Sequence, residues 1–164
     1  MFSFSLNYSI INMESGIMKI VIANDHRGTK LKNRIINMLE KKGYVVENLG
    51  TNEEESVHYP EYAFKLGEKL SNKQADFGIL ICGTGIGMSI AANKVNGVRC
   101  ALAHNVTTAQ LARQHNDANV LAISASLNFF TAKRVINTFL KTNFSDEKRH
   151  IDRINMIKEY ENHA

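Results

Sequence analysis

A cysteine followed at once by a glycine-rich loop is the part of this sequence best suited to chemistry. In residues 76–94, DFGILICGTGIGMSIAANK, an apolar run ends at Cys82, glycines occupy positions 83, 85 and 87, and a helical pattern follows. Glycines let a ligand approach the backbone closely. The free N–H groups and the dipole of a helix N-terminus favour negative charge. The segment therefore predicts an anion cradle with a thiol at its lip, where a thiolate would be stabilised.

A dinucleotide site and a purely structural turn are two other interpretations of this loop. A dinucleotide fingerprint needs G-x-G-x-x-G and an acid about twenty residues further on. Here position 88 is Met, and the next predicted strand is followed by His104 and Asn105. The spacing therefore disfavours a dinucleotide and, with it, a dehydrogenase. A purely structural role stays open on the residues alone, because a lone cysteine at a strand end is most often a small buried side chain.

Further polar and titratable residues cluster near the ends of predicted strands. They are Asn24, Asp25 and His26 after the first strand, His104 and Asn105 after the fourth, and Arg113, His115, Asn116 and Asp117 before the fifth. Sites in open parallel sheets lie beyond the carboxyl ends of the strands. These residues are therefore the candidates for a site at that edge, together with the cysteine and its glycine loop.

The elements that must position these residues alternate between strand and helix. Apolar runs predict strands at 19–24, 44–49, 76–82, 98–103 and 119–124, and helical spacing predicts helices at 29–42, 62–70, 84–94, 107–114, 129–140 and 146–160. The run at 76–82 is the most apolar and is expected at the centre. Ser145 is expected to cap the last helix, with two acids in its first turn. The alternation predicts an α/β, three-layer Rossmann-like fold with a central five-stranded parallel sheet and helices on both faces.

Composition and charge are those of a small globular domain. The chain has 164 residues, of which 44% are hydrophobic and 22% charged, and its formal net charge is +4. That excess favours small anionic ligands and does not call for nucleic acid. No stretch reaches the roughly 20 apolar residues of a membrane helix. The two cysteines form neither a disulfide framework nor a metal-ligand spacing, which favours a reducing cytoplasm.

The first seventeen residues are expected to stand apart from the domain. They have no positively charged start, and polar residues interrupt their apolar run, so they do not resemble a signal peptide. We expect residues 1–17 to be a poorly ordered or loosely packed extension and residues 18–164 to form a single domain.

Six motifs, in family order and spacing, make the chain resemble the type B ribose-5-phosphate isomerases, within the wider family that holds the galactose-6-phosphate isomerase subunits. They are ANDHRG (23–28), HYPEYA (58–63), ILICGTGIGMSIAANK (79–94), GVRCALAH (97–104), ARQHNDANVLA (112–122) and RHIDR (149–153). The resemblance implies interconversion of ribose 5-phosphate and ribulose 5-phosphate through a cis-enediolate, in the non-oxidative branch of the pentose phosphate pathway. It implies no metal, nucleotide or other cofactor.

The resemblance also assigns roles to the loop. Cys82 matches the base that removes the C2 proton. Gly83, Thr84, Gly85 and Gly87 match a cradle whose N–H groups stabilise the enediolate oxyanion. Thr84 has a hydroxyl that could relay a proton or hold a substrate oxygen, and it is also a good helix cap.

One catalytic position and three substrate-binding positions are matched by residues from other segments. His115 matches the residue that opens the furanose ring, a task suited to a side chain that ordinarily titrates near pH ~6.5. Asn116 matches a residue that binds a sugar hydroxyl. Asp25 matches an aspartate that orients sugar hydroxyls or the ring oxygen. His26 matches a substrate-binding histidine on the phosphate side.

Two arginines match the family's phosphate clamp. Arg149 and Arg153 lie four residues apart, so they share one face of a helix. Guanidinium groups suit a phosphate dianion. His150 lies between them and is a weaker candidate. A solvated basic face is the usual alternative for such a run.

The resemblance implies that the site is shared between subunits. Cys82 and the glycine loop would come from one chain, and His115 and Asn116 from the other. That arrangement needs an obligate homodimer, alone or paired into a tetramer. The apolar residues of the last predicted helix also need something to bury them.

Two departures from the family pattern keep alternatives open. Ser126 stands where many relatives carry an arginine that reaches the phosphate, and His58 replaces a frequent aspartate. An isomerase of a six-carbon sugar phosphate, such as allose or galactose 6-phosphate, is therefore one alternative. Cys82 favours the five-carbon type, because relatives without this cysteine use a carboxylate base. A non-catalytic sugar-phosphate-binding module is the second alternative, although it would not need Cys82 or His115.

Overall fold

A five-stranded parallel sheet forms the middle layer of the protein in a computed structural model that describes residues 16–163. Its strands are β1 (Lys19–Asn24), β2 (Val45–Asn48), β3 (Phe77–Cys82), β4 (Cys100–Leu102) and β5 (Val120–Ser124), in the spatial order β2-β1-β3-β5-β4. The strand with the most apolar sequence, β3, is central, as predicted.

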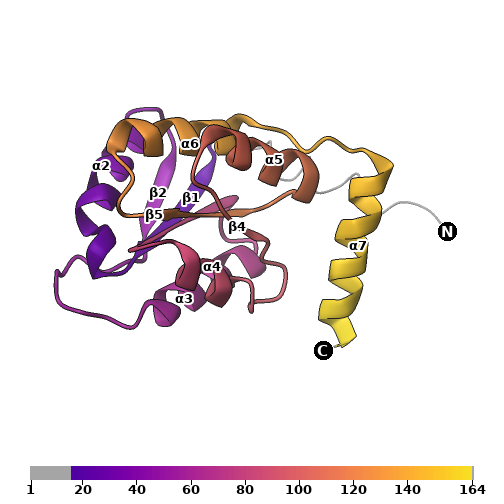
Figure 1. Ribbon diagram of the computed structural model, residues 1–164, viewed down its shortest axis with the longest axis horizontal. Coiled ribbons are helices and arrows are strands. Elements are labelled where there is room, and N and C mark those ends of the chain that lie inside the picture. Colours follow the sequence, from indigo (N-terminus) through magenta and orange to yellow (C-terminus); the bar gives the residue numbers. More distant parts are fainter. Residues whose placement is uncertain (1–15, 164) are drawn as a thin grey trace.

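Helices cover both faces of this sheet (Figure 1). One layer holds α2 (Thr29–Glu40), α5 (Val106–Asn116) and α6 (Phe129–Lys141), and the other holds α3 (Tyr59–Ser71) and α4 (Ile86–Ala92). A short 3-10 turn, η2 (His26–Gly28), follows β1, and the last helix, α7 (Lys148–His163), stands at the side of the layers. The three-layer α/β architecture predicted from the sequence is confirmed.

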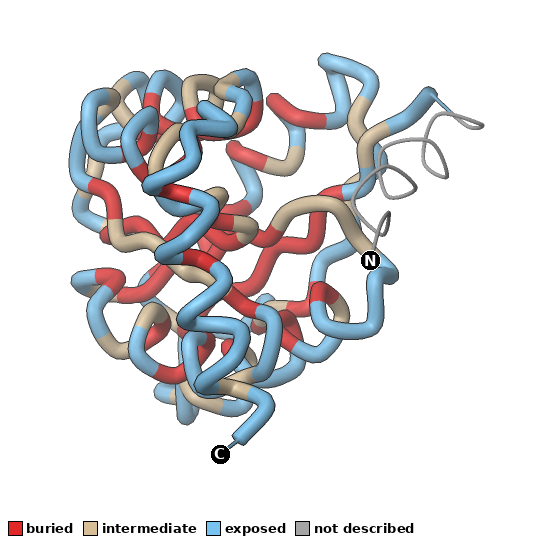
Figure 2. The backbone as a smooth tube through the Cα atoms, turned by 90° about the vertical axis from the view of Figure 1, so that its right-hand side faces the viewer, coloured by how far each residue is buried: buried red, intermediate tan, exposed pale blue. Residues whose placement is uncertain are grey.

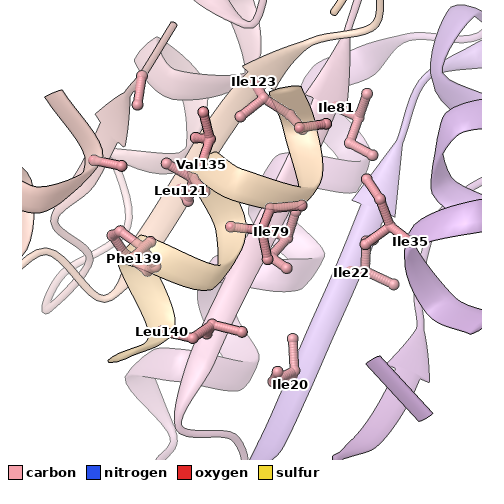
Figure 3. Close-up of a cluster of buried hydrophobic side chains, with 14 of the residues drawn as sticks. Ile20, Ile22, Ile35, Ile79, Ile81, Leu121, Ile123, Val135, Phe139 and Leu140 are labelled. Atoms are coloured by element: carbon pink, nitrogen blue, oxygen red, sulfur yellow. The ribbon is translucent and has the colours of Figure 1, made fainter. Parts of the chain in front are cut away.

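The core lies on both sides of the central strands, because alternate residues of a strand point to opposite faces. Ile20 and Ile22 of β1 belong to the cluster under α2, α5 and α6, which Figure 3 shows in close-up. Val21 and Ala23 belong to the cluster under α3 and α4. The buried segments therefore concentrate in the sheet, with exposed helix surfaces outside them (Figure 2).

Three helix starts differ from the sequence expectation by two residues or more. Helix α4, expected from residue 84, begins at Ile86 after the left-handed Gly85. Helix α3 begins at Tyr59 and takes Pro60 into its first turn, where the missing N–H of proline costs nothing. Helix α7 begins at Lys148, and its first turn holds no acid. Asp146 has a φ of 55°, a left-handed conformation that cannot start a helix, so the predicted helix start at residue 146, capped by Ser145, is wrong.

The expectation for residues 1–17 falls almost wholly on residues 1–15, which lie outside the described residues. Among residues 16–163, no helix combines the length and the apolar character that a bilayer-spanning segment needs.

The core predicts a sharp contrast between two phenylalanines of α6. Phe139 is fully buried and its ring meets that of Phe77 at 5.7 Å between centroids, whereas Phe130 is 74% exposed. Phe139→Ala is expected to lower the free energy of unfolding by about 3–5 kcal/mol. Phe130→Ala should change it by no more than about 0.5 kcal/mol. Urea unfolding of both variants checks this, and equal effects would contradict the core described above.

Candidate active site

The candidate site lies where the chain changes direction across the sheet. From β1 the chain moves outward to β2, and then crosses back to β3 on the other side of β1. Ligands of open α/β sheets bind outside the carboxyl ends of the strands at such a switch point. Asp25 follows β1 and Cys82 ends β3, so both residues flank this point.

A backbone hydrogen bond holds the sulfur of Cys82 at the start of α4. Gly85 N donates to Cys82 Sγ over 3.1 Å, and the cysteine side chain is buried. Gly85 has a φ of 81°, and a Cβ there would lie 2.5 Å from Leu102 Cδ1, so the turn requires glycine. A thiolate at Cys82 would be stabilised by this N–H and by the helix N-terminus.

The loop between Cys82 and α4 offers further N–H groups. Within the described part of the chain, the amides of Gly83, Thr84 and Gly87 donate to no protein acceptor. The residue that caps α4 is Gly85, and Thr84 Oγ1 accepts the N–H of Ile86 at 3.2 Å. The Thr84 hydroxyl therefore accepts the first backbone N–H of α4, although Thr84 lies one residue before the N-cap position. The remaining amides can receive an anion.

Ser124 orients the first peptide of this loop. Its Oγ donates to Gly83 O over 2.7 Å and accepts the N–H of Ser126 at 3.1 Å. Because a trans peptide is planar with its C=O and N–H opposed, this bond aims the Thr84 N–H away from Ser124. The hydroxyl of Ser126 lies 2.7 Å from Ser124 Oγ. No sequence pattern indicated Ser124, because its role arises from the pairing of β5 beside Cys82.

The residues after β1 are held rigidly beside the loop. Asp25 is buried, and its Oδ1 accepts the N–H of Arg27 at 2.9 Å. His26 Nδ1 accepts the N–H of Val57 in a long hydrogen bond of 3.5 Å. A neutral His26 in this arrangement carries its proton on Nε2, which can then donate to a ligand.

Two side chains that the sequence patterns did not indicate lie against the glycine loop. A Cβ on Gly83 would lie 3.0 Å from Arg27 Cδ, and a Cβ on Gly87 would lie 2.6 Å from Tyr59 Cζ. These glycines therefore allow Arg27 and Tyr59 to approach the backbone. Both residues lie inside motifs quoted above, but only the folded chain brings them to the loop.

His115 and Asn116 lie at the opposite edge of the sheet from Cys82. Helix α5 leaves the carboxyl end of β4 and returns to the amino end of β5, and these two residues form its last turn. Arg99, just before β4, donates to Asn116 O over 3.0 Å. Grouping these residues with the carboxyl ends of the strands was therefore wrong for a single chain, because a crossover helix runs antiparallel to its strands.

A second cluster forms around His115 where α7 begins. The rings of His115 and His150 stack with centroids 4.3 Å apart and an interplanar angle of 12°. Arg149 Nε donates to Glu147 Oε2 over 2.8 Å, and Arg153 lies one turn further along α7. The structure thus brings the predicted ring-opening histidine together with the predicted phosphate clamp. The loop cluster at Cys82 is separate from it.

Burial and charge act together on His150. Its side chain is buried, and among the described residues its Nε2 has no hydrogen-bond partner. Burial lowers the pKa of His150, and the positive charges of His115, Arg149 and Arg153 lower it further, against the raising effect of Glu147. His150 is therefore held as the neutral stacking partner of His115. No cluster of His, Cys, Asp or Glu suited to a metal ion occurs among residues 16–163.

The lowered pKa of His150 predicts a loss of stability in acid. As pH falls through about 6.5, the unfolded chain binds a proton at this position and the folded chain resists it, so acid favours unfolding. The free energy of unfolding should therefore fall less steeply between pH 7 and pH 5 in His150→Gln than in the wild type. Urea unfolding at several pH values measures both slopes, and parallel slopes would contradict the assignment.

Comparison with known proteins is consistent with this geometry. The profile of the ribose/galactose isomerase family matches residues 20–157. A putative sugar phosphate isomerase of Bacillus subtilis is 43% identical over 146 residues, which cover 88% of this chain and 97% of the relative. Clostridium thermocellum ribose-5-phosphate isomerase B superposes with a TM-score of 0.86 at 44% identity, covering 88% of this chain and 98% of that one. The Mycoplasma genitalium ribose-5-phosphate isomerase B, solved with bound ribulose 5-phosphate, gives 0.85 at 43% identity, covering 90% and 98%. The chain belongs to the ribose/galactose isomerase family.

Proposed function

We propose that this protein interconverts ribose 5-phosphate and ribulose 5-phosphate, with Cys82 as the base. The observation that carries the proposal is the hydrogen bond from Gly85 N to Cys82 Sγ, in a loop where the Gly83, Thr84 and Gly87 amides have no protein acceptor among residues 16–163. Such a loop can stabilise a thiolate and, next to it, an oxyanion. The related Mycoplasma genitalium enzyme with bound ribulose 5-phosphate supports this choice of substrate.

The loop and its thiolate supply the groups that the isomerisation needs. The thiolate takes the C2 proton of the open-chain aldose, and the electron pair moves so that the carbonyl oxygen at C1 becomes an oxyanion. Amides of Gly83, Thr84 and Gly87 stabilise the resulting cis-enediolate. The Thr84 hydroxyl relays the proton between the two oxygens. The thiol then returns its proton to C1, which leaves the ketose and restores the thiolate.

Ring opening requires a second copy of the chain. His115 and Asn116 lie at the amino edge of the sheet, whereas Cys82 lies at the carboxyl edge, so one chain does not join them at one substrate. In the proposed homodimer, His115 of one copy exchanges a proton with the ring oxygen of the sugar beside Cys82 of the other. Asn116 binds a sugar hydroxyl there, and Arg149 and Arg153 bind the phosphate. Asp25 and His26 act from the Cys82 side.

Exposed apolar side chains fit such a dimer. Ile86 and Ile90 of α4 are 50% and 58% exposed, directly after the glycine loop. Met156 and Tyr160 of α7 are 68% and 77% exposed, beyond the His115 cluster. A second copy seated on α4 would bury these groups and bring the two clusters together. A tetramer of two such dimers is the larger alternative, and sedimentation velocity distinguishes the two states. The free cysteines fit a reducing cytoplasm as the compartment.

The proposed role of Cys82 predicts a contrast between the two cysteines. Cys82→Ala is expected to lower kcat for ribose 5-phosphate by about a thousandfold or more, because the base is lost. Burial raises the pKa of Cys100 to about 12, so that thiol stays protonated. Cys100→Ala should therefore keep kcat within about threefold of the wild type, and a coupled spectrophotometric assay measures both variants.

The same assay separates the alternative functions. Allose 6-phosphate and galactose 6-phosphate are run beside ribose 5-phosphate. Preferred turnover of a hexose phosphate would replace the proposed substrate by a six-carbon one. If the folded wild type turns over none of the three sugars but binds them, the protein is a sugar-phosphate-binding module.

The hydrogen bond from Ser124 to Gly83 O predicts a specific kinetic loss. Ser124→Ala leaves the peptide before Thr84 unanchored, so its N–H is no longer aimed at the developing oxyanion. We expect kcat to fall about tenfold with KM little changed. Ser126→Ala, which keeps the Ser124–Gly83 bond, should lose less. A wild-type kcat in Ser124→Ala would show that the loop orients itself without this hydroxyl.

A further inference from the structure

Arg27 is a cation that the chain itself places beside the glycine loop. It belongs to η2, directly after β1 and next to His26. Its backbone N–H is held by Asp25 Oδ1 at 2.9 Å, and Asp25 is buried. The backbone of Arg27 is therefore anchored at the carboxyl edge of the sheet, at the switch point between β1 and β3.

The side chain of Arg27 lies along the loop and does not extend freely from η2. The place that a Cβ on Gly83 would occupy is 3.0 Å from Arg27 Cδ and 3.7 Å from its Nε. The guanidinium therefore begins beside the residue that follows Cys82. The residue as a whole is exposed, so its charged head can reach solvent while its apolar stem lies beside Gly83.

The guanidinium of Arg27 has no acidic partner in the described part of the chain. Three other arginines do have partners: Arg99 and Arg113 both pair with Asp117, at 3.1 and 2.7 Å, and Arg34 stacks over Phe129 at 4.1 Å. Asp25, the acid two residues earlier, accepts the backbone N–H of Arg27 instead. The planar fork of Arg27 is thus available to an external anion.

The position of Arg27 fits the phosphate end of a sugar phosphate better than the reacting end. Cys82 is only 5% exposed, so the carbons that lose and gain the proton must reach a largely buried sulfur. The phosphate dianion carries most of the substrate charge and is costly to desolvate. It is therefore best placed at the exposed rim, where the Arg27 head lies and where a bidentate pair can form.

We propose that Arg27 binds the phosphate group of the substrate, from the same chain that supplies Cys82. This rests on the proposed function and extends it: the phosphate is held between Arg27 of one copy and Arg149 and Arg153 of the other. The substrate then bridges the two copies at both of its ends. In the chain that supplies Cys82, the cation comes from the segment after β1. The segment after β5 has Ser126 in place of an arginine, and the hydroxyl of Ser126 contacts Ser124.

The test compares Arg27→Gln and Arg27→Lys with Lys30→Gln as the matched control. Lys30 carries the same charge three residues further on, and its 88% exposed side chain pairs with Glu54 at 3.4 Å. Arg27→Gln is expected to raise KM for ribose 5-phosphate and the inhibition constant of inorganic phosphate, each about tenfold, with kcat within about twofold. Arg27→Lys should recover part of the loss, and Lys30→Gln should match the wild type.

The outcomes separate this inference from the proposed function. Unchanged KM and inhibition constant in Arg27→Gln would overturn the assignment while leaving the isomerase intact. A fall in kcat with unchanged phosphate affinity would overturn it too, by placing the arginine at the reacting carbons. Direct titration of both proteins with inorganic phosphate, followed by NMR, needs no turnover. It therefore tests Arg27 even if the wild type fails to isomerise ribose 5-phosphate.

Discussion

The turn from β3 into α4 depends on one contact, the hydrogen bond from Gly85 N to the sulfur of Cys82. It forms because Gly85 adopts a left-handed φ of 81° and packs against Leu102 and Ile123 at distances that leave no room for a side chain. The thiol is then fixed at the entrance of a helix, where negative charge is favoured. Ser124 anchors the peptide between Gly83 and Thr84, and Arg27 lies beside Gly83. Residues at the ends of β1, β4 and β5 therefore contact this one loop.

Parallel-sheet topology explains why the two residue clusters lie at opposite ends of the strands. Strand ends and helix ends alternate along the chain, so residues at the end of a crossover helix lie at the amino edge of the sheet. His115 and the start of α7 occupy that edge, while Cys82 and Asp25 occupy the other. Chemistry that needs both a thiolate and this histidine at one sugar therefore favours association of two copies. The exposed isoleucines of α4 directly follow the glycine loop.

The fold could be predicted from hydrophobic patterns because both faces of β1, β3 and β5 are buried, which leaves continuous apolar runs in the sequence. The positions where helices begin were harder to predict from the sequence. Pro60 suggested a loop but occupies a first helical turn, and the acids at 146 and 147 suggested a helix start that the left-handed Asp146 prevents. Cys82 and the glycine loop were identifiable because their chemistry is local in sequence. Ser124, Arg27 and Tyr59 were not, because each reaches the loop only through strand pairing or packing.

Mixing two inactive variants tests whether Cys82 of one copy and His115 of another act on the same substrate. Cys82→Ala and His115→Ala chains are refolded together, and the mixed dimers are verified with two affinity tags. Each variant alone should be inactive. A random mixture should regain about a quarter of wild-type turnover, because half of the dimers are mixed and each of these has one intact site. Mixed dimers without turnover would contradict the shared site.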